Sequence, residues 1–211
     1  MFKKSILVIG AGGHAQSCID VIEADGQFKI IGLIGSKNEV GKEISGYSVI
    51  GTDEELVVLA SKVKNAVIGL GQIKSSDNRR RLFLNLNYYG YNLPAIISPN
   101  AYISKSAQIG DGTIVMHHAL VNSGARIGDN CIINSKANIE HNSIIESDCH
   151  ISTGAIVNGD CFIGRGTFLG SGSVVKQGCT IGQNSIIGML TSVGNNLSAN
   201  SLYVRKNNNE S

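Results

Sequence analysis

A six-residue period from residue 95 to residue 194 sets the strongest limit on how this chain can fold. One position of each hexad is always aliphatic, from Ile97 to Val193. The position two residues before it is always small, from Ala95 to Thr191, and the pattern runs through 17 hexads without a slip. A period of six fits neither an amphipathic helix nor a long strand. It predicts a solenoid of short strands and tight turns, with both positions pointing inward.

The turn and cysteine positions of the repeat follow from the same pattern. Gly, with 26 residues, and Asn are both frequent and are expected to supply the turn angles. Glycine often directly follows the aliphatic position, at Gly110, Gly128, Gly164, Gly170, Gly182 and Gly188. Four of the five cysteines occupy the small inward position, so we expect buried thiols at Cys131, Cys149, Cys161 and Cys179. Cys18 is expected in a helix core. No C-x-x-C pair exists, so no metal is predicted.

Charge and hydropathy narrow the class of protein. The net charge is only +2, from 18 basic and 16 acidic residues, which predicts neither a nucleic-acid nor a membrane partner. No apolar run is long enough for a transmembrane helix. The N-terminal apolar run is short and leads directly into a glycine motif, so we interpret it as a strand rather than a signal peptide. A cytoplasmic protein with reduced thiols is expected.

The first 90 residues alternate strands with helices. Strands are predicted at 5–9, 29–34 and 66–70, and helices after the glycine motif and at about 76–86. Residues 52–55 form a predicted capping box. This order is typical of a small α/β unit with a parallel, Rossmann-like sheet.

A glycine motif follows the first predicted strand. Gly10-x-Gly12-x-x-Ala15 stands between a strand and a helix, where backbone N–H groups can bind a pyrophosphate. The acid expected at the end of the second strand is absent, because Gly35 and Ser36 stand there, which argues against NAD. A tight turn without a ligand is the alternative. A second cluster, 69–72, could line the same crevice, and the helix face at 79–81 is expected to be solvated, although one Arg could reach a phosphate.

Among five histidines, His141 is the best candidate for chemistry. It lies two residues after an inward aliphatic position, at a turn that can project its imidazole into a cleft. An unperturbed imidazole suits a general base at neutral pH.

The whole chain resembles one family, the hexapeptide-repeat sugar acetyltransferases, which includes nucleotide-amino-sugar N-acetyltransferases of the bacillosamine and perosamine type and sialic acid O-acetyltransferases. The resemblance rests on Val8-Ile9-Gly10-Ala11-Gly12-Gly13-His14, on Ile139-Glu140-His141 and on the residues that continue to Asp160. It implies a Rossmann-like nucleotide-sugar-binding domain at 1–92, a left-handed parallel β-helix at 93–200, and a disordered tail at 201–211.

The resemblance also implies an activity and its residues. The expected reaction transfers acetyl from acetyl-CoA to the amine of a nucleotide-linked amino sugar in surface glycan biosynthesis; the alternative is sialic acid O-acetylation. A cytoplasmic homotrimer with sites between neighbouring β-helices is implied, with no metal. His141 would be the general base. Acetyl-CoA would contact His150, Gly159, Ser171 and Met189, with the Gly159 N–H at the oxyanion. The nucleotide sugar would contact Gly12, Gly13, His14 and Gly71.

The chain departs from the family pattern in three places. Asn142 replaces the Glu that follows the catalytic His in N-acetyltransferase relatives, and Glu140 or Asp148 could substitute for it. Gly35 and Ser36 replace an acidic pair, and the usual Gly-x-Pro-Ala-Lys ending is absent.

Two other classes stay open on the same solenoid. A zinc hydrolase or hydratase of the γ-carbonic-anhydrase kind needs three His ligands, but His141 and His150 are nine residues apart rather than five. A binding or scaffolding module without activity would explain Asn142 and the divergent ending.

Overall fold

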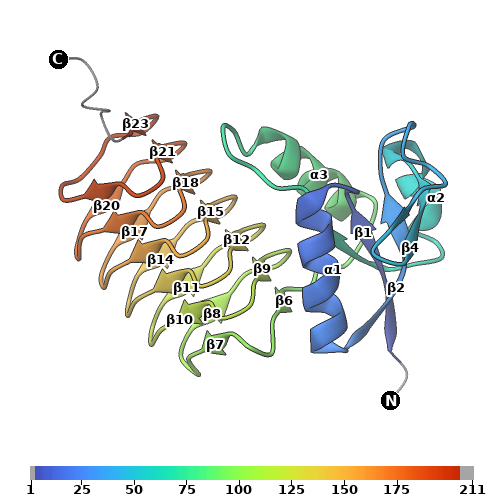
Figure 1. Ribbon diagram of the computed structural model, residues 1–211, viewed down its shortest axis with the longest axis horizontal. Coiled ribbons are helices and arrows are strands. Elements are labelled where there is room, and N and C mark those ends of the chain that lie inside the picture. The colour runs from blue at the N-terminus through green and yellow to red at the C-terminus, as the bar shows by residue number, and fades with distance from the viewer. Residues whose placement is uncertain (1–2, 205–211) are drawn as a thin grey trace. The chain divides into compact units, whose positions relative to one another are not determined.

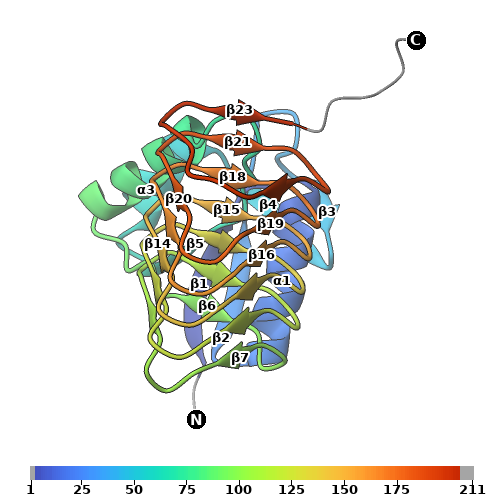
Figure 2. The same cartoon turned by 90° about the vertical axis from the view of Figure 1, so that its left-hand side faces the viewer.

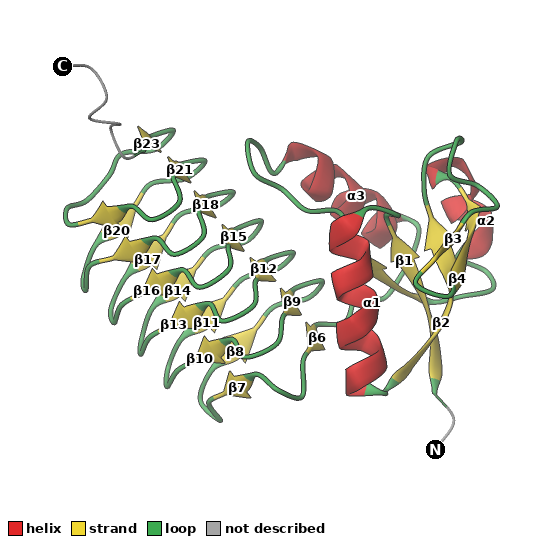
Figure 3. Ribbon diagram, in the orientation of Figure 1, coloured by secondary structure: helices red, strands yellow, loops and turns green. Residues whose placement is uncertain are grey.

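The computed structural model describes residues 3–204, and the chain divides into two compact units. The first comprises Met1–Gly71 and Asp77–Pro99, and the second comprises Gln72–Ser76 and Asn100–Ser211. The short segment Gln72–Ser76 therefore groups with the second unit, although it lies within the predicted first domain. Within the described residues, the α-helices are confined to the first unit (Figure 3).

The first unit is built on a five-stranded sheet in the order β3-β4-β2-β1-β5. Its strands are β1 (Lys4–Ile9), β2 (Phe28–Ile34), β3 (Glu43–Ile44), β4 (Tyr47–Gly51) and β5 (Asn65–Ile68). β1 pairs in parallel with β2 and β5, as the alternation of strands and helices predicts. The antiparallel pair β3–β4 was not expected from the sequence. Its turn needs positive φ at both central residues, Ser45 (49°) and Gly46 (80°), which suits a short hairpin.

The helices of the first unit begin where the sequence places their caps. α1 (Gly13–Asp25) starts after Gly12 and ends at Gly26, whose φ of 71° is left-handed. The predicted capping box is present, because Thr52 and Glu55 bond reciprocally at the start of η1 (Asp53–Glu55), which continues into α2 (Leu56–Leu59). α3 (Asp77–Tyr88) and the short strand β6 (Ile96–Ile97) complete the unit.

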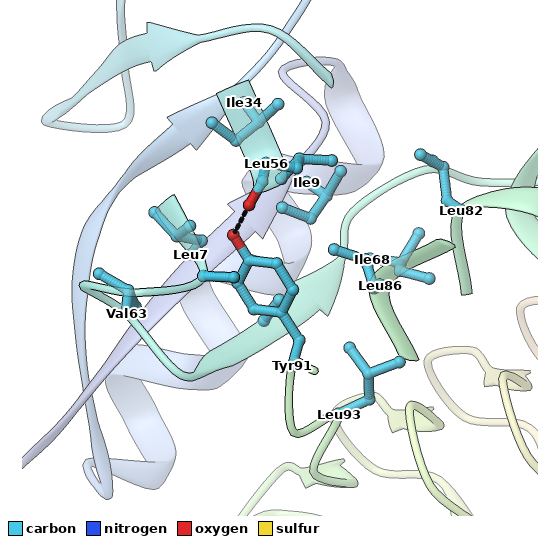
Figure 4. Close-up of a cluster of buried hydrophobic side chains, with 12 residues drawn as sticks. Leu7, Ile9, Ile34, Leu56, Val63, Ile68, Leu82, Leu86, Tyr91 and Leu93 are labelled. Atoms are coloured by element: carbon cyan, nitrogen blue, oxygen red, sulfur yellow. Dashed lines mark hydrogen bonds between the residues drawn. The ribbon is translucent and has the colours of Figure 1, made fainter. Parts of the chain in front are cut away.

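The core of the first unit is a cluster of buried aliphatic side chains from the sheet, α2 and α3 (Figure 4). Leu7, Ile68 and Leu86 are fully buried within it. Tyr91 joins the cluster, and its hydroxyl donates a hydrogen bond of 2.7 Å to the Leu56 carbonyl oxygen. Burial raises the pKa of this phenol. The cluster holds the carboxyl ends of β1 and β2 in place, next to the glycine motif.

The second unit is the predicted solenoid (Figures 1 and 2). Each strand pairs in parallel with the strand 18 residues further on, as Leu120 does with Asn138, so three hexads make one coil. This is the left-handed parallel β-helix that the resemblance predicts. One face contains β7 (Tyr102–Ile103), β10 (Leu120–Val121), β13 (Asn138–Ile139), β16 (Ile156–Val157), β19 (Val174–Val175) and β22 (Ser192–Val193).

The other two faces stack in the same way. The second contains β8 (Gln108–Ile109), β11 (Arg126–Ile127), β14 (Ile144–Ile145), β17 (Phe162–Ile163) and β20 (Thr180–Ile181). The third includes β9 (Ile114–Val115), β12 (Ile132–Ile133), β15 (His150–Ile151), β18 (Phe168–Leu169), β21 (Ile186–Ile187) and β23 (Leu202–Tyr203).

Both repeat positions point inward, as predicted. From Val115 onward the aliphatic position is at most 3% exposed, and the four solenoid cysteines are buried. Cys18 is buried in the first unit, and all five thiols are free. Buried hydroxyls at the small position are satisfied by the neighbouring coil; Ser143 Oγ, for example, donates to the Asn158 carbonyl oxygen at 2.8 Å.

The left-handed residues of the corners occupy one row of the repeat, three residues after the aliphatic position. Their φ values lie between 53° and 75° at Gly112, His118, Gly124, Asn130, Lys136, Asn142, Asp148, Gly154, Asp160, Gly166, Gly172, Gly178, Asn184 and Leu190. We call this set the corner row. Gly, Asn and Asp dominate it because they tolerate this conformation best.

The glycines directly after the aliphatic position have a different role from the predicted one. They are absent from the residues with positive φ. A Cβ at Gly164 would instead lie 2.5 Å from the backbone nitrogen of Gln183 in the next coil. These glycines allow close approach between coils rather than turn angles.

The predicted disordered tail begins too early. Leu202 and Tyr203, which fall inside it, form β23 and pair with Ile186 and Ile187 of β21. Backbone pairing therefore orders the chain to this point. The rest of the predicted tail, residues 205–211, lies outside the described residues.

Candidate active site

His141 stands at a solenoid corner between β13 and β14, as predicted. Its side chain is 47% exposed. The next residue, Asn142, belongs to the corner row with φ 58°. This backbone geometry turns the chain sharply and leaves the imidazole on the outside of the coil, where it can meet a substrate.

The two ring nitrogens of His141 have different surroundings. Asn142 Nδ2 lies 3.4 Å from Nδ1, and Asp160 Oδ2 lies 4.0 Å from the same nitrogen. Asn142 Nδ2 also donates to Asp160 Oδ1 at 3.1 Å. On the other side of the ring, a Cβ at Gly159 would fall 2.5 Å from Cε1 and Nε2. The structure thus brings together two predicted site residues, His141 and Gly159, and adds Asp160, which the sequence analysis did not assign a role.

The two carboxylates predicted to assist His141 are committed elsewhere. Glu140 accepts hydrogen bonds from Asn122 Nδ2 at 2.7 Å and Asn138 Nδ2 at 3.0 Å. The bond from Asn122 is the main cause that lowers the pKa of this carboxyl. Asp148 Oδ1 accepts from Asn130 at 2.8 Å, and its Oδ2 lies 3.6 Å from Arg165 Nη1. Neither side chain has a hydrogen bond or ion pair with the His141 ring.

His150, predicted to contact acetyl-CoA, lies on a different face of the solenoid. It begins β15 and is only 7% exposed. Its Nδ1 donates to the Gln72 carbonyl oxygen at 2.7 Å, and Asn134 Nδ2 donates to its Nε2 at 3.2 Å. The ring packs edge-on against Phe168 with centroids 5.2 Å apart. Within one chain, His150 is therefore held in a separate polar network rather than beside His141.

Ser171 and Met189 occupy equivalent positions in successive coils, 18 residues apart. Each lies in the turn after a strand of the third face, β18 and β21 respectively. Ser171 Oγ is 3.0 Å from Ser152 Oγ, and the Met189 side chain is 72% exposed. The pair forms an open edge along the coil stack.

The first unit has a pocket of about 540 Å³ at the carboxyl ends of β1 and β2. This is the end of a parallel sheet at which such folds bind ligands. Of the predicted substrate residues, Gly12 lines the pocket. Gly13 begins α1, and a Cβ on Gly71 would lie 3.6 Å from His14 Cβ, so Gly71 and His14 lie side by side.

The pocket contains charges that can address a phosphorylated ligand. Lys37 and Arg81 line it together with Asp53, Glu54 and Glu39. Lys37 Nζ lies 3.2 Å from Glu54 Oε1 in a well-exposed pair. The cations could meet a diphosphate, and the carboxylates could accept from hydroxyl or amine groups.

Two expectations about this pocket need correction. An acid does reach the region after the second strand, because Glu39 folds back and accepts from Ser36 N at 2.8 Å and Ser36 Oγ at 2.7 Å. Arg79, predicted on a solvated face, is 1% exposed; its Nη1 donates to the carbonyl oxygens of Ile68 (2.7 Å) and Leu70 (2.9 Å). Arg79 therefore supports the second glycine cluster from within, whereas Arg81 faces the pocket.

The described part of the chain contains no group of three or more His, Cys, Asp or Glu side chains that could hold a metal ion. The zinc alternative therefore finds no ligand set there. None of the helices in residues 3–204 combines the length and apolar character needed to cross a bilayer.

Comparison with protein families gives two matches, one in each part of the chain. Residues 5–85 match the PglD N-terminal domain, and residues 160–195 match the bacterial transferase hexapeptide family, described as six repeats. No curated protein sequence matches closely enough to count as a relative. Together with the β-helix and the His141 corner, these matches define an acyltransferase of the hexapeptide-repeat class.

Solved structures narrow the likeness to sugar acetyltransferases and confirm the resemblance seen in the sequence. One is a mutant perosamine N-acetyltransferase from Caulobacter crescentus in complex with CoA and GDP-perosamine, with 27% identity and a TM-score of 0.90 over 95% of this chain and 93% of that chain. Another is the acetyltransferase domain of PglB from Neisseria gonorrhoeae, with 28% identity and a TM-score of 0.85 over 92% and 93%. WeeI from Acinetobacter baumannii, at 23% identity, 94% and 95% coverage and a TM-score of 0.83, shares the fold.

Proposed function

We propose that this chain transfers the acetyl group of acetyl-CoA to the amine of a nucleotide-linked amino sugar, with His141 as the general base. The observation that carries the proposal is the contact between His141 and Gly159. A glycine there leaves open the space beside Nε2, which any larger residue would fill. Likeness to an N-acetyltransferase in complex with CoA and GDP-perosamine, over nearly the whole of both chains, supports the substrate class.

The residues of this corner suit acyl transfer to an amine. As the amine nitrogen forms its bond to the thioester carbonyl carbon, His141 Nε2 takes a proton from that nitrogen. The Gly159 N–H is proposed to donate to the oxyanion that develops on the carbonyl oxygen. When the carbon–sulfur bond breaks, the imidazolium returns its proton to the sulfur, so the products are the amide and the free thiol of CoA.

The remaining substrate contacts are proposed on both units. His150, Ser171 and Met189 are assigned to acetyl-CoA; Ser171 and Met189 lie along one edge of the coils. Gly12, Gly13, His14 and Gly71 are assigned to the nucleotide sugar, supported by the charged pocket that Gly12 lines. Lys37 and Arg81 would face the diphosphate.

Assembly as a homotrimer follows from the same placement. His141 is half-exposed, and His150 lies on another face of the same solenoid, so a single chain does not bring them together. A site between neighbouring copies would. Light scattering of the purified protein should give three times the chain mass of 22.3 kDa, and a monomer would contradict the shared site. A cytoplasmic location in surface glycan synthesis accords with five free thiols.

The test is release of CoA thiol from acetyl-CoA with a panel of UDP- and GDP-linked amino sugars, sialic acid and CMP-sialic acid. One amino-sugar acceptor should give turnover. His141→Ala should lower kcat by roughly 10²- to 10⁴-fold. Gly159→Ala should also lose activity because its Cβ collides with the imidazole.

His118→Asn is the matched control, because it changes an exposed histidine in the corner row of the same solenoid to a residue that tolerates its φ of 59°. Its activity should equal that of the unchanged protein. Turnover only with sialic acid would replace the proposal by O-acetylation. Binding of both substrates without turnover would indicate a module without activity, and full activity in His141→Ala would overturn the assignment of the base.

A further inference from the structure

The corner at His141 places two side chains against Nδ1, and they belong to neighbouring coils. Asn142 and Asp160 are 18 residues apart and both lie in the corner row, with φ of 58° and 59°. The coil period therefore stacks one directly on the other. Their side chains are joined by the 3.1 Å bond from Asn142 Nδ2 to Asp160 Oδ1. Gln177 Nε2 donates to Asp160 Oδ2 at 3.3 Å from the following coil.

A general base at Nε2 needs its ring proton on Nδ1, and the two neighbours act on that proton in opposite ways. The amide group of Asn142 presents an N–H donor to Nδ1 at 3.4 Å, which favours the tautomer protonated at Nε2. A carboxylate can only accept, so it favours the tautomer protonated at Nδ1. Charge-assisted hydrogen bonds are roughly twice as strong as neutral ones. Asp160 therefore outweighs Asn142 when its oxygen reaches the ring.

Asp160 is close enough to reach the ring. Its Oδ2 is 4.0 Å from Nδ1, and the side chains of His141 and Asp160 are 47% and 49% exposed, so each can rotate toward the other. The bond from Asn142 keeps the carboxylate beside the ring rather than in open solvent. Glu140 and Asp148 are held by other side chains, as described above. Among the described residues, Asp160 is the one carboxylate recorded in an ion pair with His141.

We propose that Asp160 is the positioning residue for His141, holding the Nδ1–H tautomer and stabilising the imidazolium formed when Nε2 takes a proton. The carboxylate that relatives carry directly after the histidine has, in this chain, its counterpart at the same corner one coil further on. Asn142 becomes the tether between them. This inference rests on the proposed function for its kinetic consequence, but the tautomer can be measured without any reaction.

The kinetic test begins with Asp160→Asn, which keeps the shape of the side chain and tolerates positive φ. Loss of a buried carboxylate behind a catalytic histidine costs about 10⁴-fold, and half exposure reduces this, so kcat should fall roughly 10- to 100-fold. KM for both substrates should stay within about twofold, because the proposed role is in proton transfer rather than binding. Asp111→Asn, an exposed carboxylate in another turn of the solenoid, should leave kcat unchanged.

A second-site rescue separates positioning from simple damage to the corner. The double variant Asp160→Asn with Asn142→Asp returns a carboxylate to Nδ1 from the neighbouring position, where Asp tolerates the left-handed backbone. It should recover most of the lost kcat. Asn142→Gly, which removes the amide but suits the same φ, should cost less than Asp160→Asn. Equal loss in the two single variants, or no recovery in the double variant, would overturn the proposal.

The readout independent of activity is the ¹⁵N NMR signature of the His141 ring, assigned by its loss in His141→Ala. The unchanged protein should show mainly the Nδ1–H tautomer at neutral pH, and Asp160→Asn should shift it toward Nε2–H. The double variant should shift it back. If no acceptor gives turnover but the tautomer responds in this way, the proposed function fails while the role of Asp160 stands. An unchanged tautomer in Asp160→Asn would overturn the inference even if the enzyme is active.

Discussion

At the scale of single residues, Glu39 shows how a side chain distant from a strand end can supply what that end lacks. The loop after β2 turns back through a bond of 2.9 Å from Glu39 N to the Ser36 carbonyl oxygen. The carboxylate then accepts from both the hydroxyl and the backbone N–H of Ser36. Both residues line the pocket of the first unit. The charge of Glu39 therefore helps to shape the loop that borders a proposed substrate site.

This arrangement predicts a pH dependence for the loop. The Ser36 hydroxyl, and then its backbone N–H, lower the pKa of Glu39 below its usual value of 4.5. A carboxyl whose pKa is lower in the folded state contributes stability above its unfolded pKa and loses it as the pH falls through its folded pKa. The loop should thus stay ordered at neutral pH and loosen in acid below about pH 4.5.

Carboxyl ¹³C NMR titration tests this link residue by residue. In Ser36→Ala the pKa of Glu39 should rise, because the hydroxyl donor is gone. Glu55 is the internal control, since Thr52 lowers its pKa independently and Ser36 does not contact it. A Glu39 titration that is the same in both proteins would show that Ser36 does not hold the carboxylate.

The same residues show what could have been found from the sequence. Ser36-Lys37-Asn38-Glu39 has the spacing of a capping box, Ser-x-x-Glu, which was recognised at Thr52–Glu55 but not here. A search confined to the strand end therefore reported a missing acid. Asp160 was overlooked for a related reason. Once three hexads make a coil, the neighbour of any corner residue is 18 positions away, so Asn142 leads directly to Asp160.

At the scale of elements, the solenoid corners separate two requirements that both select glycine. Corner-row positions need positive φ, whereas positions directly after the aliphatic residue need the absence of a Cβ. The sequence analysis found the period but merged the two, because composition alone does not distinguish a turn angle from a close approach. Leu190 stands out, since a bulky side chain rarely adopts its φ of 53°.

Substitutions at the two kinds of position should change stability in opposite directions. Leu190 is 67% exposed, so Leu190→Gly loses little burial and relieves a left-handed backbone, and should stabilise the fold by about 1 kcal/mol. Gly164→Ala should destabilise it by about 1–3 kcal/mol, because the new Cβ meets the next coil at 2.5 Å. Urea unfolding followed by circular dichroism measures both.

Gly154→Ala provides the control for the second substitution. It lies in the corner row with φ 65° and open space around its Cβ position, so only backbone strain should appear. A loss at Gly164 no larger than the loss at Gly154 would contradict the claim that coil approach requires glycine.

At the scale of the whole molecule, predictability follows how often a rule is repeated. The β-helix was predicted in full, because 17 hexads state the same inward pair and any error in one is corrected by its neighbours. The first unit has no such redundancy. Its parallel strands were expected, but the hairpin β3–β4 was not, since two short strands around Ser45–Gly46 carry little periodic signal. The position of Arg79 inside the unit depended on tertiary packing that no local pattern records.

The five cysteines offer a probe that covers both units at once, which is useful because the chain has no Trp. Cys18 is buried in the first unit, and burial raises its pKa to about 12. The other four line the inside of the solenoid, and burial likewise raises the pKa of Cys149 and of Cys161. Since the thiolate is the reactive form and none of these sulfurs is accessible, the folded protein should react with an aromatic disulfide reagent far more slowly than free thiol does.

The expected result is no fast-reacting thiol in native buffer and five in strong guanidinium chloride. Cys18→Ser should lower the unfolded count to four and report the solenoid alone, so its unfolding midpoint can be compared with that of the whole chain. One thiol that reacts quickly in the folded state would show that a coil or the α1 core opens locally, against the burial found here. Silent protein thiols would also leave CoA as the sole reactive thiol in the transferase assay, which makes the acceptor panel readable without background from the enzyme.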